Sequence, residues 1–321
     1  MKTTTRAYFD LAAAMAIVGS SVVFGKTIVA AFPVFLASGL RFAIAAVFMA
    51  PMVLNASREW RGLAKRDWAV LALMALTGQV VFTILLLIGL KRTSAIEAGI
   101  ITSLTPAAMA AVSWVLLRET INRQGIIGIA LAVLGILSVN GLLVPSAADA
   151  SVGHIWGNLL VLGAVMGEAV FLLLRKTLPP DISSLTVSGL LSMLGFVMFL
   201  PLAVWQAVDF DFTKPDLGDW GAIAYFGAVF TVVAYILWFR GVARVKGTTA
   251  GAFSAVMPVS AVILSTVFLG EPFSWTHGLG IALVLSSIAL LTRAQGKVEA
   301  AKKRHIPDWN DKESCRIGSN L

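Results

Sequence analysis

The stretch that decides the fold is Ala98-Gly99-Ile100-Ile101-Thr102-Ser103-Leu104-Thr105-Pro106, which returns 152 residues later as Ala250-Gly251-Ala252-Phe253-Ser254-Ala255-Val256-Met257-Pro258. Further identical pairs occur at offsets of 152 or 150, and they are Gly89/Gly241, Arg92/Arg244, Glu119/Glu271, Gly128/Gly280, Gly39/Gly189 and Pro51/Pro201. Coincidence does not explain so many matches at two nearly equal offsets. The chain therefore consists of two related halves.

The composition is that of an integral membrane protein. Hydrophobic residues make up 58% of the 321 residues and charged residues 13%, whereas a soluble domain has about 25% charged residues. A membrane-spanning helix needs about 20 apolar residues, and ten such stretches can be drawn, at residues 8–30, 33–54, 68–89, 94–117, 123–143, 155–175, 183–205, 219–239, 247–269 and 274–292. The sequence predicts an all-α polytopic membrane protein with ten transmembrane helices.

Each half of the chain carries five of these spans. Because five is odd, the second half must run upside down relative to the first. Inverted repeats of this kind occur in many secondary transporters, with the substrate site at the boundary between the repeats. We expect the first five-helix repeat at residues 1–143, the inverted second repeat at 144–293 and a polar cytoplasmic tail at 294–321.

Lys and Arg residues are distributed unevenly between the two sides. Of the 25 in the chain, 20 lie on the side of the N-terminus and three on the opposite side. The positive-inside rule therefore predicts a multi-pass protein of the inner membrane with both termini in the cytoplasm. The net charge of +8 lies at helix ends and in the tail. It does not form a basic patch on a soluble domain, so nucleic-acid binding is not indicated. The tail is expected to be a solvated end, with contact to anionic membrane lipids as the alternative.

Three polar residues inside the spans are candidates for a substrate site. Glu168 is the carboxylate that lies deepest in an expected span, and burying an ionisable group in the membrane is costly enough to suggest function. The amide of Gln79 has four hydrogen-bonding positions to satisfy. Arg41 could pair with a substrate carboxylate or with Glu168, or its side chain could extend to the outer interface. Glu168 could bind substrate or a proton, and the structural alternative is a pairing with a neighbouring helix.

The repeated proline stretches supply further candidates. Pro106 and Pro258 fall near the middle of the fourth and ninth expected spans, where proline kinks a helix. The nearby hydroxyls of Thr102, Ser103 and Ser254 can bond freed carbonyls or a ligand. Small residues at these places also suit close helix packing alone.

Two aromatic residues of the eighth expected span share a helix face. Tyr235 and Trp238 are three residues apart and could stack on an aromatic ligand, although Trp238 also suits the membrane interface. His154 and His277 have no metal-ligand spacing. The sequence suggests no metal site, cofactor or catalytic residue.

At Pro106, Glu119 and Gly128, and again at Pro258, Glu271 and Gly280, the chain resembles the EamA branch of the drug/metabolite transporter superfamily. The resemblance covers residues 8–292. It implies a ten-span fold with a cavity between the halves and the export of amino acids, in some members aromatic ones, or of other small metabolites. One feature departs from the family: its tryptophan-glycine pair of the first span reads Val18-Gly19 here, and the matching place in the sixth span holds Gly167-Glu168.

The leading hypothesis is a secondary transporter that exports small metabolites, foremost amino acids, by alternating access, as a monomer or weak homodimer. No Gly-x-x-x-x-Gly-Lys-Ser/Thr loop is present, which excludes ATP hydrolysis by this chain. Proton coupling stays open, with Glu168 as the candidate carrier. The alternatives are a channel, although channels are commonly rings of subunits, and an intramembrane enzyme, for which the usual serine and zinc protease motifs are missing.

Overall fold

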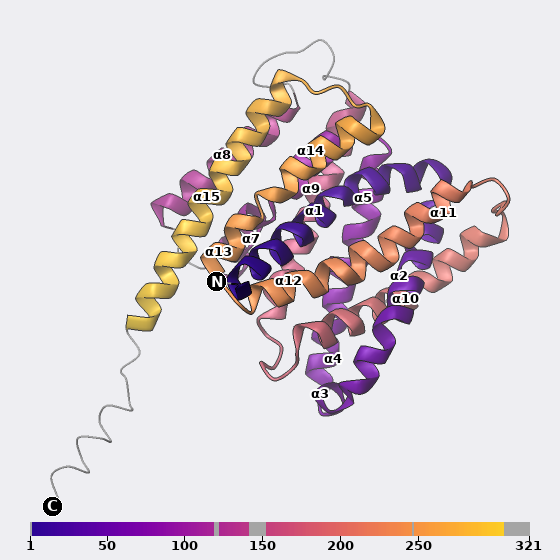
Figure 1. Ribbon diagram of the computed structural model, residues 1–321, viewed down its shortest axis with the longest axis horizontal. Coiled ribbons are helices and arrows are strands. Elements are labelled where there is room, and N and C mark those ends of the chain that lie inside the picture. The colour runs from indigo at the N-terminus through magenta and orange to yellow at the C-terminus, as the bar shows by residue number, and fades with distance from the viewer. Residues whose placement is uncertain (1, 119–121, 141–151, 246, 305–321) are drawn as a thin grey trace, which may run out of the picture.

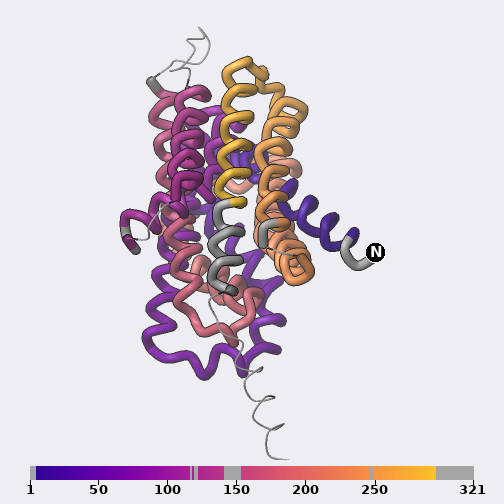
Figure 2. The backbone as a smooth tube through the Cα atoms, turned by 90° about the vertical axis from the view of Figure 1, so that its left-hand side faces the viewer, coloured from indigo at the N-terminus to yellow at the C-terminus, as the bar shows by residue number. Residues whose placement is uncertain are grey.

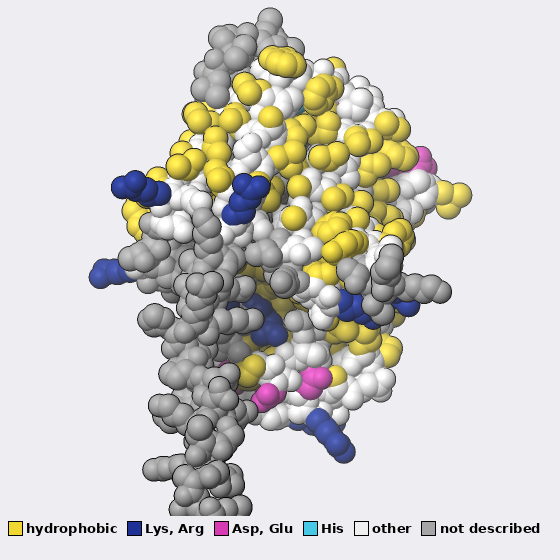
Figure 3. Space-filling model, turned by 60° about the vertical axis from the view of Figure 1, so that its left-hand side comes forward, with side chains coloured by type: hydrophobic (Ala, Val, Ile, Leu, Met, Phe, Trp, Pro, Cys, Tyr) yellow, Lys and Arg dark blue, Asp and Glu magenta, His cyan; other side chains and the backbone are white. Residues whose placement is uncertain are grey.

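The computed structural model describes residues 2–118, 122–140, 152–245 and 247–304, and within them the regular secondary structure is entirely helical. Most of the helices run roughly along one direction, so the molecule is an elongated bundle (Figure 2). Large hydrophobic side chains such as Phe48, Trp114 and Phe268 are exposed on its sides. Hydrophobic side chains cover much of the described surface in Figure 3. Such a surface suits contact with lipid.

Apart from the short helix α3, the elements follow one another in the same order in both halves; η marks π-helical segments. The first half contains α1 Lys2–Ala31, α2 Val34–Asn55, α3 Ser57–Arg61, α4 Lys65–Met74, η1 Ala75–Val81, α5 Phe82–Leu90, α6 Ala95–Thr102, α7 Thr105–Leu117 and α8 Arg123–Val139. The second half contains α9 Val152–Arg175, α10 Ser184–Val208, α11 Leu217–Ala224, η2 Tyr225–Val233, α12 Ala234–Val242, α13 Gly247–Phe253, α14 Val256–Leu269 and α15 Trp275–Arg304.

The expected number of ten spans is met only in part. Eight helices among the described residues are long and apolar enough to cross a membrane, and the bent pair α6–α7 makes a ninth. The fifth expected span, 123–143, corresponds to α8, which is apolar but 17 residues long. Its helix ends at Val139, and residues 141–151 lie outside the described part of the chain. By length alone, α8 therefore falls short of a full span.

Close contacts between equivalent helices show that the two repeats are inverted. A Cβ on Gly39 of α2 would lie 2.4 Å from Ala203 of α10, and a Cβ on Gly189 of α10 would lie 2.3 Å from Val53 of α2. The early residue of each helix thus meets the late residue of the other. The equivalent helices α2 and α10 therefore run antiparallel, side by side in Figure 1.

A second pair of equivalent helices, α8 and α15, repeats this arrangement at the opposite end of the molecule (Figure 1). Gly128 of α8 approaches Leu291 of α15, and Gly280 of α15 approaches Val139 of α8. Gly128 and Gly280 are 152 residues apart, as are Val139 and Leu291. The inverted symmetry expected from the sequence is therefore present in the side-chain packing.

Side chains of each repeat cap helices of the other. The Glu271 carboxylate accepts hydrogen bonds from the first two amides of α6 at 2.8 and 2.9 Å. Gln206 Oε1 accepts from two amides at the start of α2 at 2.8 and 3.0 Å. Glu59 Oε2 accepts from the amide of Ser183, the residue preceding α10, at 2.8 Å. These bonds satisfy amides that have no partner within their own helix. Glu119, the counterpart of Glu271, lies outside the described residues.

The fourth span is broken just before its proline. α6 ends at Thr102 and α7 begins at Thr105, and the two segments are bent by 48°. Pro106 lies in the first turn of α7, where its missing N–H needs no partner. α13 and α14 are also separated, three to four residues before Pro258, but Thr249–Leu269 runs through both as one span, and among the described residues only α6–α7 is bent by more than 40°. The expected kink is therefore present at the fourth span, two to three residues ahead of Pro106, whereas the break before Pro258 carries no comparable bend.

The third and eighth spans each contain a π-helical segment at the same place. η1 interrupts the α-helix between α4 and α5, and η2 does so between α11 and α12. Sequence patterns did not indicate these segments. π-Helical turns widen the helix and occur frequently at functional sites. The candidate residue Gln79 lies on η1.

Candidate functional site

Four of the candidate residues come together deep inside the bundle. They are Arg41 of α2, Gln79 of η1, Glu168 of α9 and Tyr235 of α12. Tyr235 interacts electrostatically with both Glu168 and Arg41, and Gln79 is a hydrogen-bonding partner of its side chain. Each of the four lies in the interior of its span. Two come from each repeat, so the cluster lies where the repeats meet.

Arg41 is held by hydroxyls and aromatic rings. Its side chain is 4% exposed, Nε donates to Thr231 Oγ1 at 2.9 Å and Nη1 donates to Thr83 Oγ1 at 3.4 Å. The rings of Phe42, Phe226 and Phe230 have their centroids 4.6–4.9 Å from its Cζ atom. Cation–π contacts at this distance stabilise a desolvated charge. Arg41 therefore remains buried instead of extending to the outer interface.

No ion pair joins Arg41 to a carboxylate within the described part of the chain. The pairing between Arg41 and Glu168 that the sequence left open is therefore not made in this conformation. Each of the two residues instead interacts electrostatically with Tyr235.

Glu168 is bonded to the broken fourth span. Thr105 Oγ1 lies 2.6 Å from Glu168 Oε2 and 3.0 Å from the carbonyl oxygen of Thr102. That carbonyl would pair with the amide of residue 106 in an unbroken helix, but Pro106 has no N–H. A hydroxyl has one proton to donate. When Glu168 is ionised, the Thr105 hydroxyl donates its proton to the carboxylate. When Glu168 is protonated, the carboxyl can donate to Thr105 Oγ1, and the Thr105 hydroxyl is then able to donate to the Thr102 carbonyl.

Three hydroxyl residues of this cluster, Thr83, Thr105 and Thr231, were not singled out from the sequence. Threonine is common in membrane spans, so a single threonine does not indicate a functional site. The internal repeat does indicate one, because Gln79 aligns with Thr231 and Thr83 aligns with Tyr235 at an offset of 152. A search for polar residues at equivalent positions of the third and eighth spans would have found both threonines.

The other expected site residues do not contribute side-chain groups to the cluster. The hydroxyls of Thr102 and Ser103 donate to carbonyls of α6, and that of Ser254 donates to the Gly251 carbonyl at 2.6 Å. Trp238 is half-buried on α12. Tyr235 stacks on Phe239, with ring centroids 6.0 Å apart, and the described ring contacts include none between Tyr235 and Trp238. These residues shape the helices around the cluster.

A buried polar network at the predicted outer end was missed by the sequence analysis. Glu97 on α6 is 2% exposed. It accepts from Asn158 Nδ2 at 2.8 Å and from the Thr93 hydroxyl, and it lies 3.2 Å from His154 Nδ1. Lys26 donates to the Thr93 carbonyl. The network joins the two repeats, since Asn158 and His154 belong to α9 and the rest to the first half.

A second cross-repeat contact lies at the predicted inner end. Asp10 of α1 is 3% exposed and lies 3.6 Å from Arg240 and 3.5 Å from Arg244. Asp10 and Glu97 escaped notice because each lies near the end of its span, where carboxylates are usually solvated. Glu168 is half-buried and differs from Asp10 and Glu97, the buried carboxylates among the described residues, by its position in the interior of its span.

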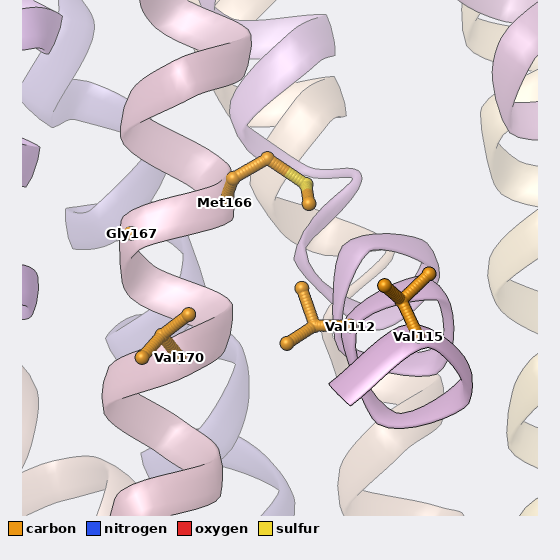
Figure 4. A pocket seen from close by; sticks show the side chains of 5 residues that line it. All are labelled: Val112, Val115, Met166, Gly167 and Val170. Carbon is orange, nitrogen blue, oxygen red and sulfur yellow. The ribbon is translucent and has the colours of Figure 1, made fainter. Parts of the chain in front are cut away.

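An apolar groove lies on the side of the bundle, between α7 and α9. Its volume is about 330 Å³, and Val112, Val115, Met166, Gly167 and Val170 line it. In Figure 4, Val112 on α7 points toward α9, which carries Met166 and Val170. Val115 and Met166 are exposed at the surface of the bundle. The groove lacks polar groups and is not the polar cluster itself.

Comparison with known proteins places this architecture in a family. The EamA-like transporter family model matches the chain twice, at residues 5–141 and 155–293. The chain is 45% identical over 282 residues to the uncharacterized transporter YetK of Bacillus subtilis, covering 88% of this chain and 85% of that protein. It is 24% identical over 228 residues to a probable terminal-alkyne amino-acid exporter of Streptantibioticus cattleyicolor, covering 71% of this chain and 74% of that protein.

A solved crystal structure has the same fold. It superposes with a TM-score of 0.59 at 18% sequence identity, over 92% of this chain and 99% of that one. The two matches of the family model coincide with the two inverted repeats seen in the helix packing. The chain therefore belongs to the EamA-like transporter family.

Proposed function

We propose that this transporter is a secondary carrier that exports small polar metabolites, foremost amino acids, by alternating access. The observation that carries the proposal is the cluster of Arg41 and Glu168 around Tyr235, two opposite charges inside the bundle where the inverted repeats meet. Buried charges in a membrane protein are costly and mark pathways for polar solutes. The amino-acid exporter among the relatives supports the same class of substrate.

Alternating access requires that each end of the bundle can close. The Glu97 network with Asn158 and His154 closes the predicted outer end, and the Asp10 contacts with Arg240 and Arg244 close the predicted inner end. Both join the first repeat to the second. Rocking of one repeat against the other would break one contact while keeping the other.

Protons are the candidate coupling ions. The Thr105 hydroxyl links the charge of Glu168 to the Thr102 carbonyl at the break of the fourth span. Uptake of a proton by Glu168 would thus alter hydrogen bonding at the point where this span bends. Such a link offers a physical route from proton binding to helix movement.

The protein is proposed to lie in a bacterial inner membrane, with both termini on the cytoplasmic side. Cys315 is the one cysteine of the chain and lies outside the described residues. A membrane-impermeant thiol reagent should leave it unlabelled in intact cells and label it once the membrane is opened. Labelling in intact cells would reverse the orientation.

Counterflow in proteoliposomes tests the transport proposal. Liposomes preloaded with a mixture of unlabelled amino acids should accumulate external labelled amino acids transiently and saturably. A flux that rises linearly with concentration and ignores the internal load would favour the channel alternative. Membership of a transporter family argues against the intramembrane enzyme.

A further inference from the structure

The guanidinium of Arg41 has hydrogen-bonding capacity that the described residues do not use. It carries five N–H donors, and Thr231 and Thr83 accept from Nε and Nη1. Thr231 donates its own proton to the Phe226 carbonyl at 2.8 Å, so its lone pairs face Arg41. The remaining donors of Nη1 and Nη2 form a planar fork, the arrangement that binds a carboxylate through two parallel hydrogen bonds.

The residues around Arg41 stabilise its positive charge but supply no negative charge to neutralise it. The three phenylalanine rings stabilise the cation through their faces, but rings and hydroxyls carry no net charge. A buried cation without a counter-ion gains most from an anion that arrives with a ligand. The same rings restrict the guanidinium to one orientation, which lowers the entropy cost of binding.

Glu168 offers the opposite charge to the same ligand. Thr105 bonds its Oε2 atom, and Oε1 has no hydrogen bond from a described residue. The side chain is half-buried. Tyr235 interacts with both Glu168 and Arg41, so a ligand beside this tyrosine has both a cation and an anion within reach.

We infer that the cluster is a binding site for small zwitterions of the α-amino-acid type, with the α-carboxylate on the Arg41 fork and the ammonium on Glu168. Tyr235 and Gln79 then border the ligand between its two charges. The inference rests on the proposed transport function and adds to it which group holds which end. Arg41 is 4% exposed, so a ligand reaches the site only after one end of the bundle has opened.

The test is recognition of the two charged groups by the purified full-length protein. Thermal unfolding is measured with the twenty amino acids, and with the methyl ester and the N-acetyl derivative of each amino acid that stabilises, because a ligand stabilises the state to which it binds. The ester lacks the carboxylate charge and the N-acetyl derivative lacks the ammonium. Both should bind at least ~30-fold more weakly than the parent amino acid, since each leaves one buried charge unpaired.

The variant Arg41→Gln should lose the preference for the free acid over the ester, and Arg41→Lys should lose most of it because an ammonium lacks the planar fork. Arg41→Lys serves if Arg41→Gln does not fold. The matched control is Arg61→Gln, which removes an arginine whose Cζ lies 5.8 Å from the Trp60 ring centroid at the surface. This control should keep the full preference.

The outcomes separate the two proposals. If a folded Arg41 variant discriminates acid from ester as the wild type does, the zwitterion site is wrong. If no amino acid stabilises the protein but it exchanges another solute in counterflow, the zwitterion site is wrong and the carrier function stands. If neither amino acids nor other metabolites are exchanged, the carrier function fails.

Discussion

The two repeats share their packing but not their charges. Gly39 and Gly189 lie in equivalent close contacts, and so do Gly128 and Gly280. The charged residues of the cluster have no such counterparts. At offsets of 150 or 152, Arg41 aligns with Leu191, Glu168 with Val18 and Thr105 with Met257. In the proposed transport cycle, the symmetric contacts would let the repeats exchange roles in two related packings, whereas the unpaired charges would give the site one orientation.

The polar but uncharged positions of the cluster are intermediate between the symmetric glycine contacts and the charged residues that have no counterpart. Gln79 and Thr231 are equivalent, and so are Thr83 and Tyr235, and all four are polar. The symmetric framework therefore supplies hydrogen-bonding groups from both repeats. The first repeat adds the cation and the second adds the anion. An asymmetric ligand would be bound in one direction by a nearly symmetric frame.

The largest effect is expected from removing the charge that has no counterpart. Glu168→Gln keeps the shape of the side chain and should lower both net flux and exchange about tenfold or more, because a charge-assisted bond to the ligand is lost. The substitution Val18→Ala, at the equivalent position of the first repeat, should leave transport near normal. Both are measured in proteoliposomes at two pH values.

Other results for Glu168→Gln would change the interpretation. Loss of pH-dependent net flux with exchange retained would support the proton role of Glu168 but show that it does not bind the ammonium of the ligand. Unchanged flux and exchange would remove it from the mechanism and leave the asymmetry of the cluster without a function.

The symmetric contacts should respond equally to equivalent changes. Gly39→Ala and Gly189→Ala introduce a Cβ only 2.4 and 2.3 Å from atoms of the facing helix. Each should destabilise the protein by about 1–3 kcal/mol, the usual cost of overpacking. Thermal unfolding in detergent measures the effect. Gly62→Ala and Gly221→Ala are the controls, since nothing lies within 4 Å of a Cβ at either position. A large effect at only one of the two packed glycines would contradict the equivalence.

The residues that end α7 and α14 are equivalent in position, but substitutions at them should change stability in opposite directions. Arg118 and Gly270 are 152 residues apart and both adopt a left-handed conformation, with φ of 52° and 64°. Glycine adopts it freely, while other residues lose roughly 1 kcal/mol. Arg118→Gly should therefore stabilise the protein and Gly270→Ala should destabilise it by a similar amount in the same unfolding assay. Shifts of equal sign would show that the two ends are not equivalent.

The smallest effect concerns the helix caps. The Ser183 backbone amide, and then the Thr186 side chain, hold the pKa of Glu59 below its ordinary value. The carboxylate therefore contributes stability that is present above pH ~5 and is lost as the pH falls below the usual Glu range. Glu59→Gln should remove this acid dependence and cost less than about 1 kcal/mol, because the site is largely exposed.

The comparison for Glu59 is Gln206, which caps α2 with a neutral amide. Gln206→Glu should introduce an acid dependence of the same sign at the other end of the bundle. Unfolding temperatures measured from pH 3 to 7 report both variants. A wild-type curve that stays flat below pH 5 would show that the Glu59 cap contributes nothing.

Much of this fold could be predicted from the sequence because each half of an internal repeat can be checked against the other half. The matched glycines and prolines located the two halves, and the odd number of spans predicted their inversion. The interior charges Arg41 and Glu168 stood out because hydrocarbon tolerates few ionisable groups. The domain limits at 143 and 293 stay a prediction.

The rest depends on contacts between residues far apart in the chain. Glu97 and Asp10 lie near span ends, and only packing shows that they are buried and joined to the other repeat. The π-helical segments have no sequence signature comparable to a proline. The breaks before Pro106 and Pro258 precede the prolines because each ring lies in the first turn of the next helix, a shift that spacing alone does not fix.

The central claim is that the two ends of the bundle open in turn around the charged cluster, and cross-linking each end tests it most directly. In a Cys315→Ser background, Thr93→Cys with Asn158→Cys is used to lock the predicted outer end, and Asp10→Cys with Arg244→Cys to lock the predicted inner end. Each pair is cross-linked by a bis-methanethiosulfonate reagent, which forms one disulfide with each thiol and releases sulfinate. Each lock should lower exchange by roughly tenfold or more until a reductant cleaves the disulfides, since a carrier must open to both sides. Exchange that continues with either end locked would contradict alternating access.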